Sequence, residues 1–302
     1  MVPENGYLKV LLTGGSGFVG RNLVKYLQGK ANILQISLRA QIQPLAEDVD
    51  IVIHLAGKAH DLKQVASADE YYKVNLDLTK AIYDEFLVSN AEKFIFVSSV
   101  KAVADSVPGV LDEEAIPNPG THYGKSKLLA EEYIKSRPLP AGKHYYILRP
   151  CMIHGPGNKG NLNMLYRFVK SGIPYPLAAF SNKRSFLSVE NLCFIIQELV
   201  SRDIPDGMFN VADDESLSTN QVIKLLSCAT GKSPRLLRVP VSWIRTMAKI
   251  GDKMGLPLNT ERLEKLTENY QVSNSKIKTA LGKELPVSSS EGLLLTALSF
   301  NS

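Results

Sequence analysis

Tyr123 and Lys127 are four residues apart in the segment Tyr123-Gly124-Lys125-Ser126-Lys127. On a helix, residues at this spacing share one face. A free tyrosine has a pKa near ~10, and an ammonium group ~4 Å away at an effective dielectric constant of ~20 lowers it by ~3 units. We therefore predict that Lys127 lowers the pKa of Tyr123 to roughly 7, which suits a general acid/base. The same spacing also occurs by chance on surface helices.

A hydrophobic run over residues 94–99 ends in two hydroxyl side chains, Ser98 and Ser99. The run predicts a buried strand. A hydroxyl at the carboxyl end of that strand can hydrogen-bond a substrate oxygen beside the tyrosine. Either serine could instead cap the turn that follows.

Gly14, Gly17 and Gly20 follow a predicted strand and open a predicted helix. Their spacing, GxxGxxG, differs by one residue from the GxGxxG pattern of dinucleotide-binding loops. Glycines let the backbone approach a pyrophosphate, and the helix N-terminus offers free N–H groups. The pattern predicts nucleotide binding, and the alternative is a tight turn without a ligand.

The choice of coenzyme depends on the end of the second predicted strand, where Arg39 stands and no acid is present. An acid about 20 residues after the loop binds the ribose of NAD, whereas a basic residue favours the 2′-phosphate of NADP. Arg39 therefore favours NADP, unless it is a solvated loop residue. Both NAD and NADP stay open at this point.

The elements that must position these residues alternate along the first half of the chain. Short apolar runs predict strands at residues 8–12, 33–38, 50–56, 94–99 and 145–148. Amphipathic stretches predict helices at residues 18–28, 69–89 and 123–136. This alternation indicates an α/β fold with a doubly wound parallel sheet covered on both faces.

Two domains are expected. Residues 1–150 form the nucleotide-binding domain, with a strand and helix returning to it near residues 184–212. Residues 151–302 form mainly a smaller mixed α/β carboxy-terminal substrate domain, with predicted helices at 161–172, 190–201 and 219–230, strands at 186–189 and 208–211, and a last helix capped by Ser288.

Composition excludes several classes of protein. The chain has 302 residues with 44% hydrophobic and 22% charged side chains, which is average for a globular protein. Its net charge of +5 comes without a block of five or six like charges, so we expect neither a nucleic-acid nor a membrane partner. The excess suits an anionic small molecule.

No stretch of 18 apolar residues occurs, and the first nine residues lack the pattern of a signal peptide. The three cysteines form no CxxC pair, and the five histidines have no metal-ligand spacing. We expect a cytoplasmic protein without a metal site, in which His54 is a buried core residue.

Six motifs in order carry a resemblance: TGGSGFVG (13–20), IVIHLAG (51–57), FIFVSSVKA (94–102), YGKSK (123–127), LRPCMIHGPG (148–157) and RSFLSVENL (184–192). Together they resemble the extended short-chain dehydrogenase/reductase family, in its nucleotide-sugar epimerase/dehydratase branch. The resemblance covers nearly the whole chain and implies a Rossmann-type fold. It is strongest to UDP-glucose 4-epimerase-like proteins, a group that includes 4-ketoreductases making UDP-N-acetylquinovosamine-type sugars.

The resemblance implies roles at matching positions. Tyr123 is the expected acid/base, Lys127 its partner and a ligand of the nicotinamide ribose, and Ser99 the catalytic serine, with Ser98 second. Tyr123 and Ser99 also contact the substrate. Expected coenzyme ligands are Gly14, Gly17, Phe18, Val19, Gly20, Leu55, Ala56, Gly57, Lys127 and Pro150, with Arg39 from the argument above.

The same resemblance assigns Arg184 to the diphosphate of a UDP-sugar, with Asn161 a weaker candidate for that ligand. It implies a homodimer formed through the helices at 69–89 and 123–136. Three departures stand out. Only 34 residues separate Gly20 from His54, too few for the family's usual third strand and its adenine contacts. Met152 replaces a substrate-contacting asparagine, and Arg262 is a weak match for a second diphosphate arginine.

We therefore expect an NAD(P)-dependent enzyme that moves a hydride at C4 of a UDP-hexose through a 4-keto intermediate. A UDP-sugar 4-epimerase is the first expectation. The alternative is an NADPH-dependent reductase of a UDP-4-keto-6-deoxy-hexosamine, which would use Tyr123, Lys127 and Ser99 identically. A non-catalytic NAD(P)-binding sensor is the third reading, and the retained Tyr123, Lys127 and Ser99 count against it.

Overall fold

The computed structural model describes residues 6–37, 45, 48–58, 67–158, 160–255 and 259–301. The described strands are β1 (Lys9–Thr13), β2 (Asn32–Ile36), β3 (Ile51–His54), β4 (Lys93–Val97), β5 (Val110–Leu111), β6 (His144–Pro150), β7 (Met152–His154), β8 (Phe186–Ser188), β9 (Gly207–Val211) and β10 (Gln271–Val272). The described α-helices are α1 (Phe18–Leu27), α2 (Ala68–Tyr72), α3 (Leu78–Val88), α4 (His122–Ser136), α5 (Asn161–Lys170), α6 (Val189–Ser201), α7 (Thr219–Ala229), α8 (Val241–Met254), α9 (Thr260–Thr267), α10 (Ser275–Leu281) and α11 (Ser289–Leu298).

A six-stranded sheet, in the order β2-β1-β3-β4-β6-β9, forms the centre of the described structure. Every neighbouring pair is parallel. The predicted α/β fold with a parallel sheet is confirmed, and each predicted strand of the first half is present with ends shifted by a few residues. β2 is the edge strand, so the described sheet has no further strand beyond it.

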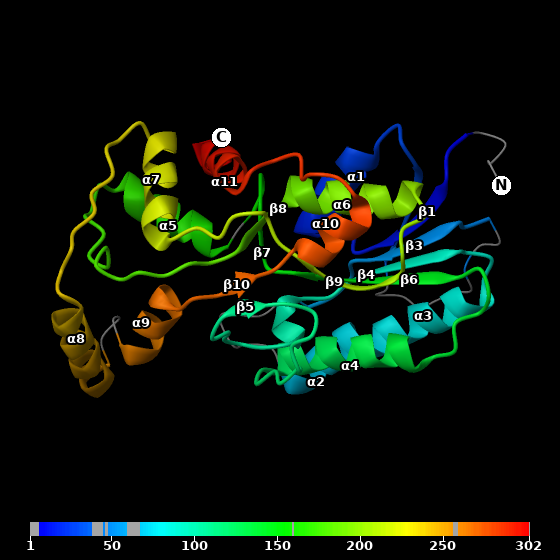
Figure 1. Ribbon diagram of the computed structural model, residues 1–302, viewed down its shortest axis with the longest axis horizontal. Coiled ribbons are helices and arrows are strands. Elements are labelled where there is room, and N and C mark those ends of the chain that lie inside the picture. Colours follow the sequence, from blue (N-terminus) through cyan, green and yellow to red (C-terminus); the bar gives the residue numbers. More distant parts are fainter. Residues whose placement is uncertain are drawn as a thin grey trace.

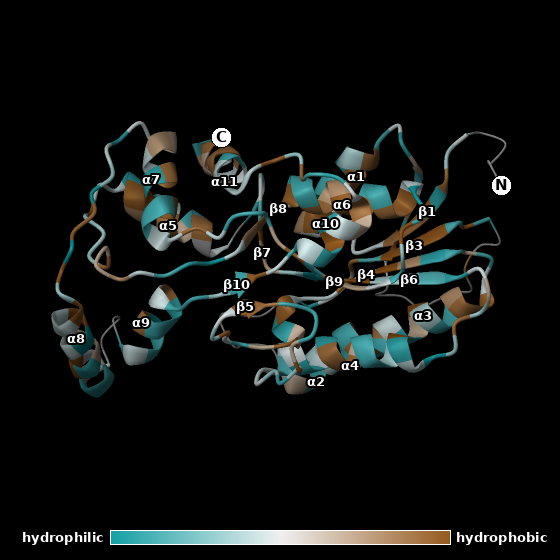
Figure 2. Ribbon diagram, in the orientation of Figure 1, coloured by the Kyte–Doolittle hydropathy of each residue, from teal (hydrophilic) through white to brown (hydrophobic). Residues whose placement is uncertain are grey.

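Helices cover both faces of the sheet (Figure 1). On one face lie α1, α6 and α10, and on the other lie α2, α3 and α4. Each side has its own apolar core, and the strands between them are largely hydrophobic (Figure 2). This packing explains why the strands of the first half read as continuous apolar runs.

The chain reverses its direction of travel across the sheet at β1, which lies between β2 and β3. In open α/β sheets, ligands bind at the carboxyl ends of the strands next to such a switch point. The glycine loop follows β1 at this place. The two serines follow β4, and Pro150 ends β6 at the same edge.

The second half of the chain contributes to two bodies. β9 joins the central sheet beside β6, and α6 packs against α1. Helices α5, α7, α8, α9 and α11 enclose a separate apolar core next to the short β7–β8 pair (Figure 1).

The helix expected at residues 69–89 contains an irregular turn. A π-helical turn at Lys73–Asp77 separates α2 from α3. Such turns re-aim side chains and occur often at functional sites. Here the turn places Asn75 in the interior, where it is fully buried.

None of the helices within the described residues is both long enough and apolar enough to cross a membrane.

Candidate active site

Helix α4 presents Tyr123 in its first turn, directly beside the turn that follows β4. The side chain of Thr121 caps the helix by accepting from the Gly124 amide at 3.1 Å. A Cβ at Gly124 would overlap the Lys101 carbonyl and lie 2.8 Å from Pro119 Cβ. A glycine is therefore needed here for the helix to approach the turn that contains Ser99.

The structure distinguishes the two candidate serines. Ser99 forms a hydrogen bond with the Tyr123 side chain, whereas the Ser98 hydroxyl donates to Glu131 Oε1 at 2.5 Å. Ser99 is thus the serine beside the tyrosine. Ser98 belongs to a buried network behind it.

The pKa of Tyr123 is shifted in the opposite direction to the one we expected from the sequence. Burial raises it, and the hydrogen bond with Ser99 only partly opposes that shift. The Lys127 ammonium donates to the Val97 carbonyl at 3.0 Å and lies 4.7 Å from the centre of the Phe96 ring. The prediction that Lys127 lowers the tyrosine pKa is therefore wrong for this arrangement, because burial of the phenol outweighs the hydrogen bond with Ser99.

Lys127 is itself strongly affected by its surroundings. Burial lowers the pKa of its amine to about 8, and the charge of Glu131 acts against that shift. An amine with this pKa changes its charge close to neutral pH, so it can exchange a proton as well as donate hydrogen bonds.

Glu131 and Arg149 form a buried ion pair that the sequence analysis missed. Each is only 1% exposed. Arg149 Nε lies 3.0 and 3.1 Å from the two carboxylate oxygens, and its Nη2 lies 2.5 Å from Oε2. With Ser98 on the same carboxylate, the pair ties β4 and β6 to α4. Glu131 stands four residues after Lys127 on the same helix face, a spacing that could have revealed it.

Asn75 joins the π-helical turn to α4 and to the end of β3. Its amide nitrogen donates to Ser126 Oγ at 3.0 Å and to the Lys58 carbonyl at 3.2 Å, while its oxygen accepts from the Lys58 amide at 2.7 Å. A Cβ at Gly57 would lie 3.1 Å from Lys127 Nζ. Residues 55–58 are therefore held beside the lysine, as expected for a coenzyme path over Leu55, Ala56 and Gly57.

The glycine loop has the features that a dinucleotide pyrophosphate needs. Gly14 adopts a φ of +74°, and a Cβ there would lie 2.6 Å from the Ala56 amide nitrogen. A Cβ at Gly20 would overlap the Gly14 carbonyl. Helix α1 has no side-chain cap at Gly17 and no acid in its first turn, so its first amides remain available to an anion.

Three of the expected ligands need separate mention. Pro150 is buried at the end of β6, paired with Val211 of β9. Arg39 lies outside the described residues. Asn161 begins α5, but its side chain lies outside the described part of the structure.

Arg184 lies on the substrate side of the sheet edge and already has an anionic partner. Its Nη2 donates to Glu268 Oε1 and to the Lys265 carbonyl, both at 2.5 Å. Its Nε is buried and has no hydrogen-bond partner among the described residues. Arg262 lies on α9 together with Lys265. A diphosphate at Arg184 would therefore compete with the Glu268 carboxylate.

Tyr270 connects Arg184 to the turn that contains Ser99. Its backbone pairs with that of Arg184, and its hydroxyl donates to the Ala104 carbonyl at 2.7 Å. Lys101 Nζ lies 4.2 Å from the centre of the Tyr270 ring. Tyr270 thus links the backbone at Arg184 to the turn that follows Ser99, although the two are distant in sequence.

Two buried histidines, His54 and His154, form hydrogen bonds with threonine hydroxyls inside the protein. His54 lies between the hydroxyls of Thr13 and Thr79, at 2.7 and 3.0 Å, and burial lowers its pKa to about 3. It is the core residue that we expected. Among the residues that the structure describes, no three His, Cys, Asp or Glu side chains are grouped to hold a metal ion.

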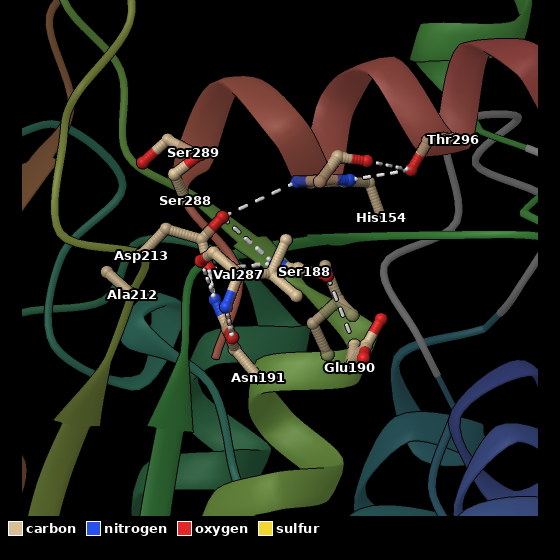
Figure 3. Close-up of polar contacts among 12 residues, drawn as sticks. His154, Ser188, Glu190, Asn191, Ala212, Asp213, Val287, Ser288, Ser289 and Thr296 are labelled. Carbon is tan, nitrogen blue, oxygen red and sulfur yellow. Dashed lines mark hydrogen bonds and ion pairs between the residues drawn. The ribbon is translucent and has the colours of Figure 1, made fainter. Parts of the chain in front are cut away.

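His154 is the centre of a buried polar cluster separate from the Glu131–Arg149 pair (Figure 3). Its Nδ1 lies 2.9 Å from Thr296 Oγ1, and its Nε2 lies 3.7 Å from Asp213 Oδ2. The Asp213 carboxylate accepts from the Ser188 amide at 3.0 Å and from Asn191 Nδ2 at 2.7 Å. This cluster fixes α11 against β7 and the start of α6.

Comparison with known proteins gives a consistent result. Residues 10–212 match the family model described as "NAD dependent epimerase/dehydratase family". The chain is 29% identical to a UDP-glucose 4-epimerase of Vibrio cholerae, over 96% of this chain and 95% of the relative. It is 30% identical to a UDP-2-acetamido-2,6-beta-L-arabino-hexul-4-ose reductase of Pseudomonas aeruginosa, over 52% of this chain and 38% of the relative.

The fold is also shared with solved structures. The crystal structure of a UDP-N-acetylglucosamine 4-epimerase from Bacillus cereus superposes with a TM-score of 0.75. The alignment covers 98% of this chain and 100% of that one, at 22% sequence identity. At this identity the likeness shows the fold.

Proposed function

The chain belongs to the NAD dependent epimerase/dehydratase family, and from that premise we propose that it is an NAD(P)-dependent 4-epimerase of a UDP-hexose. The observation that carries the proposal is the hydrogen bond between Ser99 and Tyr123, with Lys127 one turn further along α4. These three groups lie at the sheet edge where the glycine loop also ends. The full-length similarity to a UDP-glucose 4-epimerase supports the choice of reaction.

Tyr123 is the residue that moves the proton of the sugar's C4 hydroxyl in this proposal. Loss of hydride from C4 leaves a ketone only if the hydroxyl proton also leaves, so a base must contact that oxygen. A bound nicotinamide coenzyme supplies the acceptor and donor of the hydride. Ser99 holds the same sugar oxygen, and its bond to Tyr123 stabilises the phenolate.

Lys127 and the groups around it orient this chemistry. Its ammonium is held by the Val97 carbonyl and stands beside Gly57, where the nicotinamide ribose is expected. The free amides at the start of α1, with Gly14, Gly17, Phe18, Val19 and Gly20, would hold the pyrophosphate. Leu55, Ala56 and Pro150 would line the path of the coenzyme.

Arg184 is the residue that we propose for the diphosphate of the UDP-sugar, with Asn161 in support. A guanidinium group can bind phosphate through two parallel N–H bonds, and the buried Nε of Arg184 is available for one of them. Since Glu268 now occupies Nη2, substrate binding would have to displace that carboxylate.

A 4-ketoreductase is the second candidate. It is favoured by the local 30% identity to a reductase of a UDP-4-keto sugar. The end of β2 also lacks the acid that would select NAD, and Arg39 follows it in the sequence. In this case Tyr123 would give a proton to the ketone oxygen, and a bound NADPH would supply the hydride for one reduction.

We also propose a homodimer formed through α2, α3 and α4, and a cytoplasmic location. The support for the interface includes exposed apolar side chains on these helices, Val88 on α3 and Leu129 on α4. The support for the location is that Cys151, Cys193 and Cys228 are all free, as in proteins of reducing compartments.

The test is to incubate the purified protein with UDP-N-acetylglucosamine or UDP-glucose and resolve the C4 epimers by NMR. The coenzyme released by denaturation is identified in parallel. Formation of the epimer with retained NAD supports the epimerase. Net consumption of added NADPH on a UDP-4-keto-6-deoxy sugar, without epimer formation, supports the reductase. The absence of both activities would contradict the proposal.

A further inference from the structure

Helix α8 exposes a continuous apolar stripe. The neighbouring face of α8 is buried: Ile244 and Ala248 pack into the apolar core of the second half of the chain. The stripe itself points outward, at the helical spacing of four, three and four residues. Its members, with their exposed fractions, are Trp243 (69%), Met247 (55%), Ile250 (48%) and Met254 (68%).

Such a stripe is unusual on a soluble monomer. Single exposed apolar residues need no explanation, but contiguous exposed apolar side chains mark sites of interaction. α8 packs against α9 and lies at the end of the molecule opposite the central sheet (Figure 1). Its outer surface is therefore accessible to a large partner.

The charge of the protein is concentrated in the same place. Residues 232–254 contain six of the chain's 35 lysines and arginines and one of its 30 acidic residues. The rest of the chain therefore has 29 basic and 29 acidic residues, so this segment carries the whole net charge of +5.

Four of these basic side chains remain available. Within the described part of the chain, Arg238, Arg245, Lys249 and Lys253 are exposed and form no ion pair. On the helix, the three basic residues of α8 occupy a face separate from the buried one, and Lys253 lies next to the apolar stripe. An exposed apolar stripe beside unpaired cations complements a partner that has an apolar interior beneath an anionic surface layer.

We propose that α8 docks the protein on the surface of a membrane that contains anionic phospholipid. An amphipathic helix with Trp and aliphatic side chains on one face and Lys and Arg on another lies in the plane of such a surface. At 14 residues α8 is ~21 Å long, too short to span a bilayer. A second copy of the chain fits the stripe less well, since it would bring two segments of charge +5 together.

The chain provides its own reporter for this proposal, because Trp243 is its one tryptophan. We expect vesicles of phosphatidylcholine and phosphatidylglycerol to shift the emission of Trp243 to shorter wavelength and to carry the protein in flotation. Vesicles of phosphatidylcholine alone should do so weakly. Added salt should reduce binding, because the basic side chains are exposed.

Two variants separate the apolar and the charged contributions. Ile250→Glu should lower the partition coefficient by about tenfold or more, since it removes a buried aliphatic side chain at the interface. Lys253→Gln should lower it by about fivefold, the contribution of one basic residue near an anionic surface. The matched controls are Leu295→Glu on α11 and Lys224→Gln on α7, which change exposed residues elsewhere and should leave binding unchanged.

Three outcomes would overturn the proposal. The first is an unchanged Trp243 emission with anionic vesicles. The second is a shift that depends on protein concentration and needs no lipid, which would assign the stripe to a second copy of the chain. The third is an equal loss of vesicle binding in Leu295→Glu and Ile250→Glu. Far-ultraviolet circular dichroism of each variant checks that the fold is kept.

Discussion

The polar groups behind Tyr123 and those around Arg184 are built in different ways. Behind Tyr123, the Glu131 carboxylate contacts Arg149 and Ser98, and the charged side chains are almost fully buried. Around Arg184, the ion pair with Glu268 is between side chains that are 21% and 30% exposed. One arrangement is sealed from water, and the other is accessible to it.

The difference indicates separate tasks. A buried pair cannot exchange partners without a large desolvation cost, so it fixes the positions of Ser99, Tyr123 and Lys127. A partly exposed pair contributes little net stability and can be replaced by a better anion. We infer that the chemistry is prearranged in the first half of the chain, while the contacts of the second half are exchanged when ligands bind.

The largest expected effect is that of Tyr123→Phe. The change removes one oxygen and almost no volume, so fold and coenzyme binding should be kept. Turnover should fall by ~10²–10⁴-fold, the usual contribution of general acid/base catalysis. Steady-state kinetics on the C4 epimers measure it, with coenzyme titration as the control for binding.

The free energy of unfolding tests the contrast between the buried Glu131–Arg149 pair and the partly exposed Arg184–Glu268 pair. Glu131→Gln should lower the free energy of unfolding by ~3–5 kcal/mol, because it leaves the Arg149 charge buried without a counter-ion. The matched variant Glu268→Gln should change it by less than ~1 kcal/mol, because that pair is partly exposed. Urea unfolding of both variants measures this, and equal losses would remove the distinction between the two regions.

The buried residue His54 should also make the free energy of unfolding depend on pH. Its pKa is about 3 in the folded chain and near ~6.5 when unfolded, so the unfolded state binds more protons between these values. The free energy of unfolding should therefore fall as pH decreases from ~6.5, by about 2 kcal/mol at pH ~5. His54→Gln should lack this part of the pH dependence, and an unchanged slope in that variant would show that His54 does not titrate as described.

The smallest expected effect is that of Arg184→Lys, at the partly exposed ion pair. Arg184→Lys keeps the charge but loses the second parallel N–H bond to phosphate, so KM for the UDP-sugar should rise by about tenfold. Coenzyme affinity should not change, since the glycine loop lies apart from this residue. An unchanged KM would count against placing the diphosphate at Arg184.

Local patterns predicted the fold and part of the site. Alternating apolar runs and the glycine spacing are properties of neighbouring residues, and they gave the strands and the loop within a few residues. The raised pKa of Tyr123 could not be predicted, because it depends on burial of the phenol in the folded chain and on the Tyr71 ring that folding brings beside it. Arg184 and Glu268 are 84 residues apart, so their pairing appears only after folding.

The α8 surface shows a different limit. Its basic residues are three to seven positions apart, so a search for consecutive like charges did not find them. Its apolar residues carried no prediction of their own, and the structure shows which of them are exposed. For that reason the sequence predicted no membrane partner, whereas the structure supports the proposal of one.

The central claim is that the hydride of C4 leaves and returns during epimerisation. A UDP-hexose carrying deuterium at C4 tests it most directly, with the product analysed by mass spectrometry and NMR. We expect a C4-inverted sugar that keeps its deuterium at C4, because the same hydride returns to the other face of the ketone. Inversion with loss of the deuterium to solvent would contradict it.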